Sequence, residues 1–255
     1  MVIAGIVAGG TGSRMGGTMP KQFLKVGGTP IILHTVRSFL RCSAVDAVVI
    51  GVHPDWKEYL EELLSQEYAA SESNKGQPKE HTAGNVSVEQ RLLVTAGGAT
   101  RNDTILRMLD AADAQWGISD DTIVLTHDAV RPLVSIGIIE DNIRTAAAYG
   151  VCTTALPAVD TIAHSDNQAY VTDIPRRDEM YQVQTPQSFR YGLFREVHAD
   201  ITQEELAHAT DVCKLFSLRG HKVYLVKGSA ENFKITYPFD LRLAESVLAS
   251  GGENS

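Results

Sequence analysis

Glycine and basic residues gather in one short stretch near the start of the chain. Residues 8–16 read Ala-Gly-Gly-Thr-Gly-Ser-Arg-Met-Gly, and Pro20-Lys21-Gln22 follows them closely. Glycines lack a Cβ, so their backbone N–H groups can approach phosphate oxygens closely. Arg14 can contact two phosphate oxygens at once, whereas Lys21 adds a point charge. The stretch therefore predicts a loop that binds a triphosphate.

Glycines alone would also suit an ordinary turn between a strand and a helix. The stretch lacks the GxxxxGK[ST] pattern of a P-loop, and its glycines do not follow the GxGxxG spacing of a dinucleotide site. No acidic residue stands about 20 positions further on to bind a ribose, which makes a nicotinamide-dependent oxidoreductase a poor alternative. The presence of Arg14 and Lys21 favours phosphate binding over a plain turn.

Two later segments place polar residues directly after predicted strands. The first is 97–104, Gly-Gly-Ala-Thr-Arg-Asn-Asp-Thr, and the second is 127–132, His-Asp-Ala-Val-Arg-Pro. Paired glycines can let backbone groups approach a bound ligand closely. Asp128 suits Mg²⁺, which keeps several water molecules and takes few protein ligands. His127 could act as a base, but a packing and hydrogen-bonding role is favoured.

Strands that alternate with helices should position these loops. Apolar runs predict strands at 2–8, 45–52, 92–95, 122–126, 151–156 and 222–226. Helical spacing predicts helices at 31–40, 56–64, 102–114, 136–149, 191–197, 210–216 and 239–248. This order predicts an α/β fold with a mostly parallel sheet. The loops after Ala8, Thr95 and Thr126 should then share the carboxyl edge of the sheet, where such folds bind ligands.

Two segments interrupt this order. Residues 66–90 are polar and contain Gly76 and Pro78, so we interpret them as an exposed insertion whose composition also suits disorder. Residues 157–181 lose the helical spacing and hold Ser-Asp-Asn at 165–167, a turn signal between β-favouring pieces. We interpret 157–181 as a β-arm that projects from a single domain spanning 1–255.

Composition excludes several classes of function. The formal net charge of -8 argues against a general nucleic-acid-binding protein, which needs a basic surface. The three cysteines, Cys42, Cys152 and Cys213, are too widely spaced for a zinc site and predict reduced, partly buried thiols. No signal peptide and no apolar run of about 20 residues are found, so we expect a cytoplasmic protein that does not enter a membrane.

Five ordered motifs resemble the cytidylyltransferases that make CDP-activated polyols and CDP-methylerythritol. They are GGTGSRMG with PKQF, the segments at 97–104 and 127–132, Gln-Thr-Pro-Gln at 184–187 and Asn-Phe-Lys-Ile-Thr at 232–236. The similarity runs over nearly the whole chain. It implies a Rossmann-like domain of the nucleotidyltransferase type, whose protruding β-arm serves in homodimer formation.

The resemblance also implies a role for each matching residue. It makes Arg14, Lys21 and Lys234 catalytic, and Asp128 the ligand of Mg²⁺. The residues implied to bind CTP are Ala8, Gly9, Gly10, Thr11, Gly12, Gly97, Gly98, Ala99, Arg101, Thr104 and Ala129. Those implied to bind the acceptor are Asp160, Arg131 and Lys234. Simpler roles stay open for three of these residues: a helix start for Arg101, a salt bridge within its loop for Arg131 and a turn residue for Asp160. Relatives carry an acidic residue near 99–100, where this chain has Ala99 and Thr100.

Two acceptors compete within this family, ribitol 5-phosphate and methylerythritol 4-phosphate. Enzymes of the second kind resemble one another in an arginine before Asp-Thr at the start of the arm, where this chain has Val159. The Ile-Pro-Arg-Arg run at 174–177 and the Asp-Val-Cys-Lys run at 211–214 resemble the first kind. The resemblance thus implies CDP-ribitol and pyrophosphate as products, for use in teichoic acid and cell-wall assembly. A nucleotide-binding regulator that has lost catalysis remains the alternative from another class.

Overall fold

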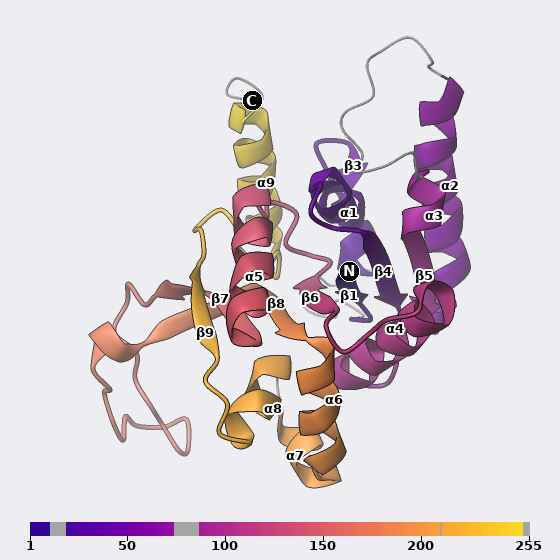
Figure 1. Cartoon of the computed structure of the whole chain (residues 1–255). Helices are drawn as coiled ribbons and strands as arrows, with labels where there is room; N and C mark the ends of the chain where they lie inside the picture. The colour runs from indigo at the N-terminus through magenta and orange to yellow at the C-terminus, as the bar shows by residue number, and fades with distance from the viewer. Residues whose placement is uncertain (11–18, 74–86, 210, 252–255) are drawn as a thin grey trace.

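The computed structural model describes residues 1–10, 19–73, 87–209 and 211–251 (Figure 1). Its strands are β1 Val2–Ala8, β2 Lys25–Val26, β3 Thr29–Pro30, β4 Ala47–Val52, β5 Leu92–Ala96, β6 Ile123–Asp128, β7 Val151–Pro157, β8 Tyr181–Arg190 and β9 Tyr224–Lys227. Its α-helices are α1 Ile31–Arg41, α2 Lys57–Ser73, α3 Val88–Arg91, α4 Arg101–Trp116, α5 Ile136–Tyr149, α6 Tyr191–Asp200, α7 Gln203–His208, α8 Val212–Leu218 and α9 Pro238–Gly251. Short 3₁₀ turns cover Lys21–Phe23, Pro54–Trp56 and Arg177–Glu179.

The main sheet has the order β5-β4-β1-β6-β8-β7-β9. Strands β5, β4, β1 and β6 pair in parallel, as do β7 and β9, whereas β8 runs antiparallel to both of its neighbours. The predicted α/β class with a mostly parallel sheet is confirmed. The antiparallel β8 is not among the predicted strands, and it joins the two parallel groups.

Helices cover both faces of this sheet. One apolar core joins the sheet to α1, α2 and α5, with Phe39, Leu60 and Ile139 among its buried members. A second core lies on the opposite face under α4, α6 and α8, around Phe189 and Phe216. Helix α9 packs with the β2–β3 ribbon through a smaller cluster that includes Val26 and Ile235. Because both faces are covered, the central strands β4 and β6 are buried at every position.

Close packing brings α4 against the sheet near the carboxyl ends of its strands. A Cβ at Gly51 in β4 would lie 2.5 Å from Cγ2 of Thr104 and 3.0 Å from the side chain of Met108. Only a glycine leaves room for this approach. The first turn of α4 is thereby held beside the ends of β1, β4 and β5, as the alternating pattern predicted.

The arm leaves the body between β7 and β8 and projects away from it (Figure 1). The two strands pair as far as Pro157 and Tyr181, and beyond them a single bridge joins His164 to Asp173. The N–H of His164 donates to Asp173 O at 2.8 Å, and the N–H of Thr172 donates to His164 O at 2.8 Å. The predicted hairpin turn is therefore present, although regular strands do not extend into 158–180.

The interpretation of 66–90 as one polar insertion is wrong for its two ends. Helix α2 continues through Ser73, because Glu, Gln and Ala residues after Leu64 favour a helix even where the apolar spacing has stopped. At the other end, residues 88–90 belong to helix α3, which leads directly into β5. Residues 74–86 are outside the described ranges.

All three cysteines are free and buried, as expected. Burial raises the pKa of Cys152 to about 12, so this thiol stays protonated at neutral pH. None of the helices in the described part of the chain combines the length and apolar content needed to cross a bilayer.

A cation-lined pocket as candidate active site

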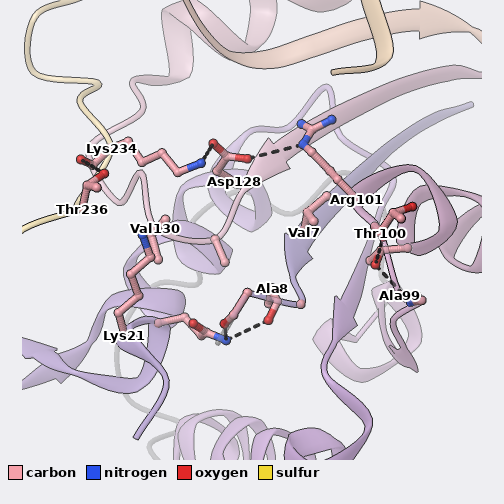
Figure 2. Close-up of a pocket in the computed structure, with 16 residues that line it drawn as sticks. Val7, Ala8, Lys21, Ala99, Thr100, Arg101, Asp128, Val130, Lys234 and Thr236 are labelled. Atoms are coloured by element: carbon pink, nitrogen blue, oxygen red, sulfur yellow. Dashed lines mark hydrogen bonds and ion pairs between the residues drawn. The ribbon is translucent and has the colours of Figure 1, made fainter. Parts of the chain in front are cut away.

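A pocket of about 390 Å³ opens at the carboxyl edge of the sheet (Figure 2). Its walls come from five parts of the chain: the ends of β1 and β6, the 3₁₀ turn Lys21–Phe23, the turn before α4 and the loop after β9. The lining residues are Val7, Ala8, Gly9, Gly10, Lys21, Gln22, Gly98, Ala99, Thr100, Arg101, Thr104, Asp128, Ala129, Val130, Lys234 and Thr236. The prediction that the three loops meet at one edge is confirmed.

The described part of the first glycine loop is held by Gln22. The side-chain Nε2 of Gln22 donates to Ala8 O at 2.7 Å and to Gly10 O at 3.1 Å. Gln22 is buried, so these bonds fix the direction in which the loop leaves β1. Of the predicted phosphate ligands in this loop, Thr11, Gly12 and Arg14 lie outside the described residues.

The second loop is a tight turn that ends in the first turn of α4. The side-chain Oγ1 of Thr104 accepts the N–H of Gly98 at 3.0 Å and donates to Thr100 O at 2.9 Å. Thr100 caps the helix by accepting the N–H of Asp103. The positive end of α4 thus faces the pocket, where it favours a negatively charged ligand.

Gly97 and Gly98 are required by the closeness of this turn to α4. A Cβ at Gly98 would lie 2.2 Å from Cβ of Asp103, and one at Gly97 would lie 3.1 Å from Oγ1 of Thr104. Gly97 does not line the pocket, and its carbonyl accepts a bond from Arg107 Nη1 at 3.1 Å. Gly98 and Ala99 do line it, so backbone groups rather than long side chains form this wall.

Asp128 stands at the centre of three positive charges. Its carboxylate lies 3.0 Å from Lys234 Nζ, 3.4 Å from Arg131 Nε and 3.7 Å from Arg101 Nε. Figure 2 shows Lys234 and Arg101 approaching this carboxylate from opposite sides. Burial works to raise the pKa of Asp128, but the three cations together outweigh it and hold the pKa well below its usual range. The carboxylate is therefore ionised throughout the neutral range.

The loop that carries Asp128 is supported from behind by His127 and Arg131. His127 is fully buried, and its Nε2 lies 3.1 Å from Arg131 O while its Nδ1 lies 2.9 Å from Thr185 Oγ1. Burial lowers the pKa of His127 to about 4, so the ring is neutral at pH 7. This placement fits the expected hydrogen-bonding role, because no edge of the ring reaches the pocket wall.

The three residues predicted to bind the acceptor lie in different surroundings. Arg131 lies behind Asp128, and its Nη1 donates to Asn232 O at 2.8 Å. The salt bridge within the loop, left open as the simpler role of Arg131, is present. Asp160 is exposed at the start of the arm and does not line the pocket of its own chain. Lys234 lines the pocket with 41% of its side chain exposed.

Lys21 faces the pocket from the wall next to the first glycine loop. Its Nζ donates to Ile235 O at 2.9 Å, which connects the 3₁₀ turn Lys21–Phe23 to the loop after β9. The backbone N–H of Ile235 in turn donates to Val130 O at 2.9 Å. The residues expected to be catalytic, Lys21 and Lys234, are therefore brought to one pocket, which Asp128 also lines.

Comparisons with known proteins agree with this geometry. The family model described as 2-C-methyl-D-erythritol 4-phosphate cytidylyltransferase matches residues 2–250. The chain belongs to this cytidylyltransferase family. Among curated proteins, it is 39% identical over 249 residues to ribitol-5-phosphate cytidylyltransferase of Streptococcus pneumoniae (strain ATCC 700669 / Spain 23F-1), covering 97% of this chain and 99% of the relative.

Solved structures of the family have the same fold over almost the whole chain. The 4-diphosphocytidyl-2C-methyl-D-erythritol synthase of Anaerococcus prevotii DSM 20548 is similar with a TM-score of 0.73 at 26% identity, covering 97% of this chain and 98% of that one. The 2-C-methyl-D-erythritol 4-phosphate cytidylyltransferase of Thermus thermophilus gives 0.68 at 29% identity, covering 98% and 100%. The Rossmann-like architecture inferred from the motifs is therefore confirmed.

Several residues of this cytidylyltransferase pocket were not predicted from the sequence. Thr236 lines the pocket, and Gln22, Thr185 and Asn232 hold its loops in place. Gln22, Thr185, Asn232 and Thr236 all lie within motifs that marked the family resemblance. The motifs thus signalled their importance, but sequence spacing could not show which loops they connect.

The neutral state of His127 predicts a specific loss of stability in acid. The unfolded chain should bind a proton near the ordinary pKa of 6.5, whereas the folded chain binds it only near 4. The free energy of unfolding therefore contains the full contribution of the neutral His127 above pH 6.5. That contribution declines by about 3 kcal/mol in total as the pH falls towards 4. Urea unfolding at a series of pH values should show this decline in the free energy of unfolding.

The change His127→Gln should remove the decline between pH 6.5 and 4, because glutamine does not titrate. His164→Gln, at an exposed position in the arm, serves as the matched control and should leave it in place. The stability that Asp128 contributes is present above its ordinary pKa of 3.8 and is lost mainly below it, so its share of the decline between pH 6.5 and 4 is small. An unchanged decline in His127→Gln would contradict the assignment.

Proposed function

We propose that the chain transfers CMP from CTP to ribitol 5-phosphate, giving CDP-ribitol and pyrophosphate. The observation that carries the proposal is a pocket beside two glycine turns that is lined by Lys21, Lys234 and Arg101, of which Lys234 and Arg101 pair with an ionised Asp128. Membership of the cytidylyltransferase family supplies the nucleotide and the reaction class.

The arrangement of charges suits this transfer. A phosphate oxygen of the acceptor attacks the α-phosphorus of CTP, and the bond to the pyrophosphate oxygen breaks. Negative charge then increases on the equatorial oxygens and on the leaving pyrophosphate, where fixed cations lower the barrier. Lys21 and Lys234, which line the same pocket, are suited to this task together with Arg14. A phosphate monoester is already ionised at neutral pH, so the transfer needs no general base.

A magnesium ion fits the pocket only together with the triphosphate. Among the described lining residues, Asp128 is the single carboxylate, and no group of three histidine, cysteine or acidic residues is found in the described part of the chain. The cluster of Asp128 with Arg101, Arg131 and Lys234 has a net charge of two positive units, which repels a free divalent cation. Mg²⁺ commonly binds through one or two carboxylates and substrate phosphates, and Asp128 would hold it in that way. When bound, the ion would supply further stabilisation of charge on the phosphates.

Ribitol 5-phosphate is favoured as acceptor by two observations. The curated relative at 39% identity acts on this substrate by its name, whereas the two methylerythritol-type structures compared above are 26% and 29% identical. Val159 also stands where enzymes of the methylerythritol type resemble one another in an arginine. An acceptor without that cationic contact, and with more hydroxyl groups, suits Asp160 as a hydrogen-bonding partner.

Release of pyrophosphate with a panel of acceptors tests the proposal. With CTP and Mg²⁺, turnover should be fastest with ribitol 5-phosphate and slower with methylerythritol 4-phosphate or a sugar 1-phosphate. Preference for methylerythritol 4-phosphate would overturn the acceptor while keeping the reaction class. Binding of CTP without turnover of any acceptor would instead support the alternative of a nucleotide-binding regulator that has lost catalysis.

Removing a cation from the pocket should lower turnover far more than stability. We expect Lys21→Ala and Arg14→Ala each to reduce kcat by about 10²–10³, the usual cost of losing one group that stabilises transition-state charge. The midpoint of thermal unfolding should change little by comparison, since Lys21 adds no apolar packing to the core. Lys25→Ala, at an exposed position in the nearby β2, is the control and should retain normal turnover. Wild-type turnover in Lys21→Ala would refute its role.

We also propose that the arm joins two copies of the chain. Its exposed apolar side chains include Val159, Tyr170, Val171 and Ile174, each more than half exposed in one chain. Such a concentration on a projecting segment is typical of a surface that is covered in an assembly.

Ile174→Asp should convert a dimer into a monomer in light scattering after gel filtration. Phe239→Asp changes a similarly exposed residue on α9 and should leave the dimer intact. A wild-type protein that is monomeric would contradict the proposal.

A further inference from the structure

The Gln-Thr-Pro-Gln motif of β8 has no role in the chemistry described above, yet its first half contacts the loops of the pocket. Gln184 and Thr185 are both buried. The N–H of Asp128 donates to Thr185 Oγ1 at 3.1 Å, and the same oxygen lies 2.9 Å from His127 Nδ1. Because the hydroxyl accepts from Asp128, its own hydrogen is available to His127 Nδ1. The proton of the neutral ring then sits on Nε2, which donates to Arg131 O.

Asn232 makes the corresponding contacts from the loop after β9. Its side chain is fully buried, and its Nδ2 donates to Thr185 O at 2.8 Å and to Gln184 Oε1 at 3.2 Å. Its backbone oxygen accepts the bond from Arg131 Nη1. Lys234 follows only two residues later. The loop that carries Lys234 is thus bound both to β8 and to the loop that carries Asp128.

These contacts join the two charged groups of the pocket through buried backbone. The direct ion pair of Lys234 with Asp128 cannot fix their positions alone, because the lysine side chain is long and 41% exposed. Ion pairs with an exposed partner contribute little to stability, because water screens the two charges. Buried hydrogen bonds are costlier to break, since the buried polar group is then left with neither a protein partner nor water. The buried contacts are therefore the stronger constraint on the two loops.

We propose that Thr185 and Asn232 are positioning residues, which form a buried bridge that sets Asp128 and Lys234 at their working separation. We call this pair the Thr185–Asn232 bridge. This proposal rests on the proposed function, because the bridge acts on the groups assigned to the transfer. It gives the Gln-Thr-Pro-Gln and Asn-Phe-Lys motifs one shared task, although Gln184 and Asn232 are 48 positions apart.

The experiment compares three threonine variants of the full chain. Thr185→Val keeps the shape of the side chain and removes the hydroxyl, so kcat should fall by about 10–10² because a small misplacement of reacting groups is costly. The KM for CTP should change by less than about threefold, since the glycine turns that bind the nucleotide are untouched. Thr185→Ser restores the hydroxyl and should recover most of kcat.

Thr154→Val is the matched control, because Thr154 is a buried threonine of the adjacent β7 whose hydroxyl donates to Pro186 O at 2.7 Å. It should lower the melting temperature without lowering kcat. Asn232→Ser removes the amide that donates to Thr185 O and Gln184 Oε1, and it should reproduce the loss of kcat. This variant keeps the test possible if Thr185→Val fails to fold. An unchanged kcat in either folded bridge variant, or an equal loss in Thr154→Val, would overturn the proposal.

A measurement that does not depend on turnover tests this proposal independently of the proposed function. In ¹H–¹⁵N spectra, wild-type His127 should carry its proton on Nε2, with an Nδ1 shift typical of an accepted hydrogen bond. Thr185→Val should move the Nδ1 signal, and Thr185→Ser should restore it. If the wild-type enzyme transfers CMP to no acceptor, the function fails but these spectra still judge the bridge. Identical His127 signals in wild type and Thr185→Val would refute the bridge itself.

Discussion

The site depends on one buried carboxylate that three cations surround. Each of the three cations is attracted to Asp128, and the attraction to Lys234 is the most strongly screened because that side chain is 41% exposed. Arg101, Arg131 and Lys234 repel one another at the same time, so the cluster is stable only while Asp128 lies between them. The excess positive charge that remains is the property a triphosphate requires. The backbone around Asp128 must therefore be held firmly, and much of the surrounding structure serves that need.

The order of the strands provides this support. Strands β1 and β6 end beside each other, so the glycine loop and Asp128 emerge at neighbouring positions of one edge. The antiparallel β8 enters the sheet at the same edge, next to β6 on one side and β7 on the other. Its buried hydroxyl and amide groups can then meet the backbone of Asp128 and the loop after β9. A parallel strand in this place would begin at the opposite edge, and its first residues would lie far from the pocket.

Much of the fold could be predicted from the sequence because its central strands and main helices are apolar in a regular pattern. Helix α5 begins and ends where the spacing predicted, and the loops after β1 and β6 carried visible glycine and acidic signals. Strand β8 was missed because its buried half is rich in Gln, Thr and Ser, which are satisfied by hydrogen bonds instead of apolar contacts. Helix α2 was predicted too short, since its last turns are helical by intrinsic preference.

The supporting residues of the site could not be found in the same way. Thr185 and Asn232 contact one another across 47 positions, and their meeting depends on the direction of β8. Periodicity describes one element at a time and contains no information on which loops lie side by side. Arg131 illustrates the same limit, because its type and position suited a substrate ligand as well as the internal ion pair that the structure contains.

Strand β8 also connects the arm to the pocket. Its residues 181–183 are exposed where they leave the arm, and burial begins at Gln184, the first residue to contact Asn232. The arm and the two charged loops are therefore attached to one short piece of backbone, at the edge where β7 also ends. A surface that covers the arm would restrain the start of β8, and the loops bound to Gln184 and Thr185 would be restrained with it. Assembly and catalysis can in this way depend on the same strand, although no described residue of the arm lines the pocket of its own chain.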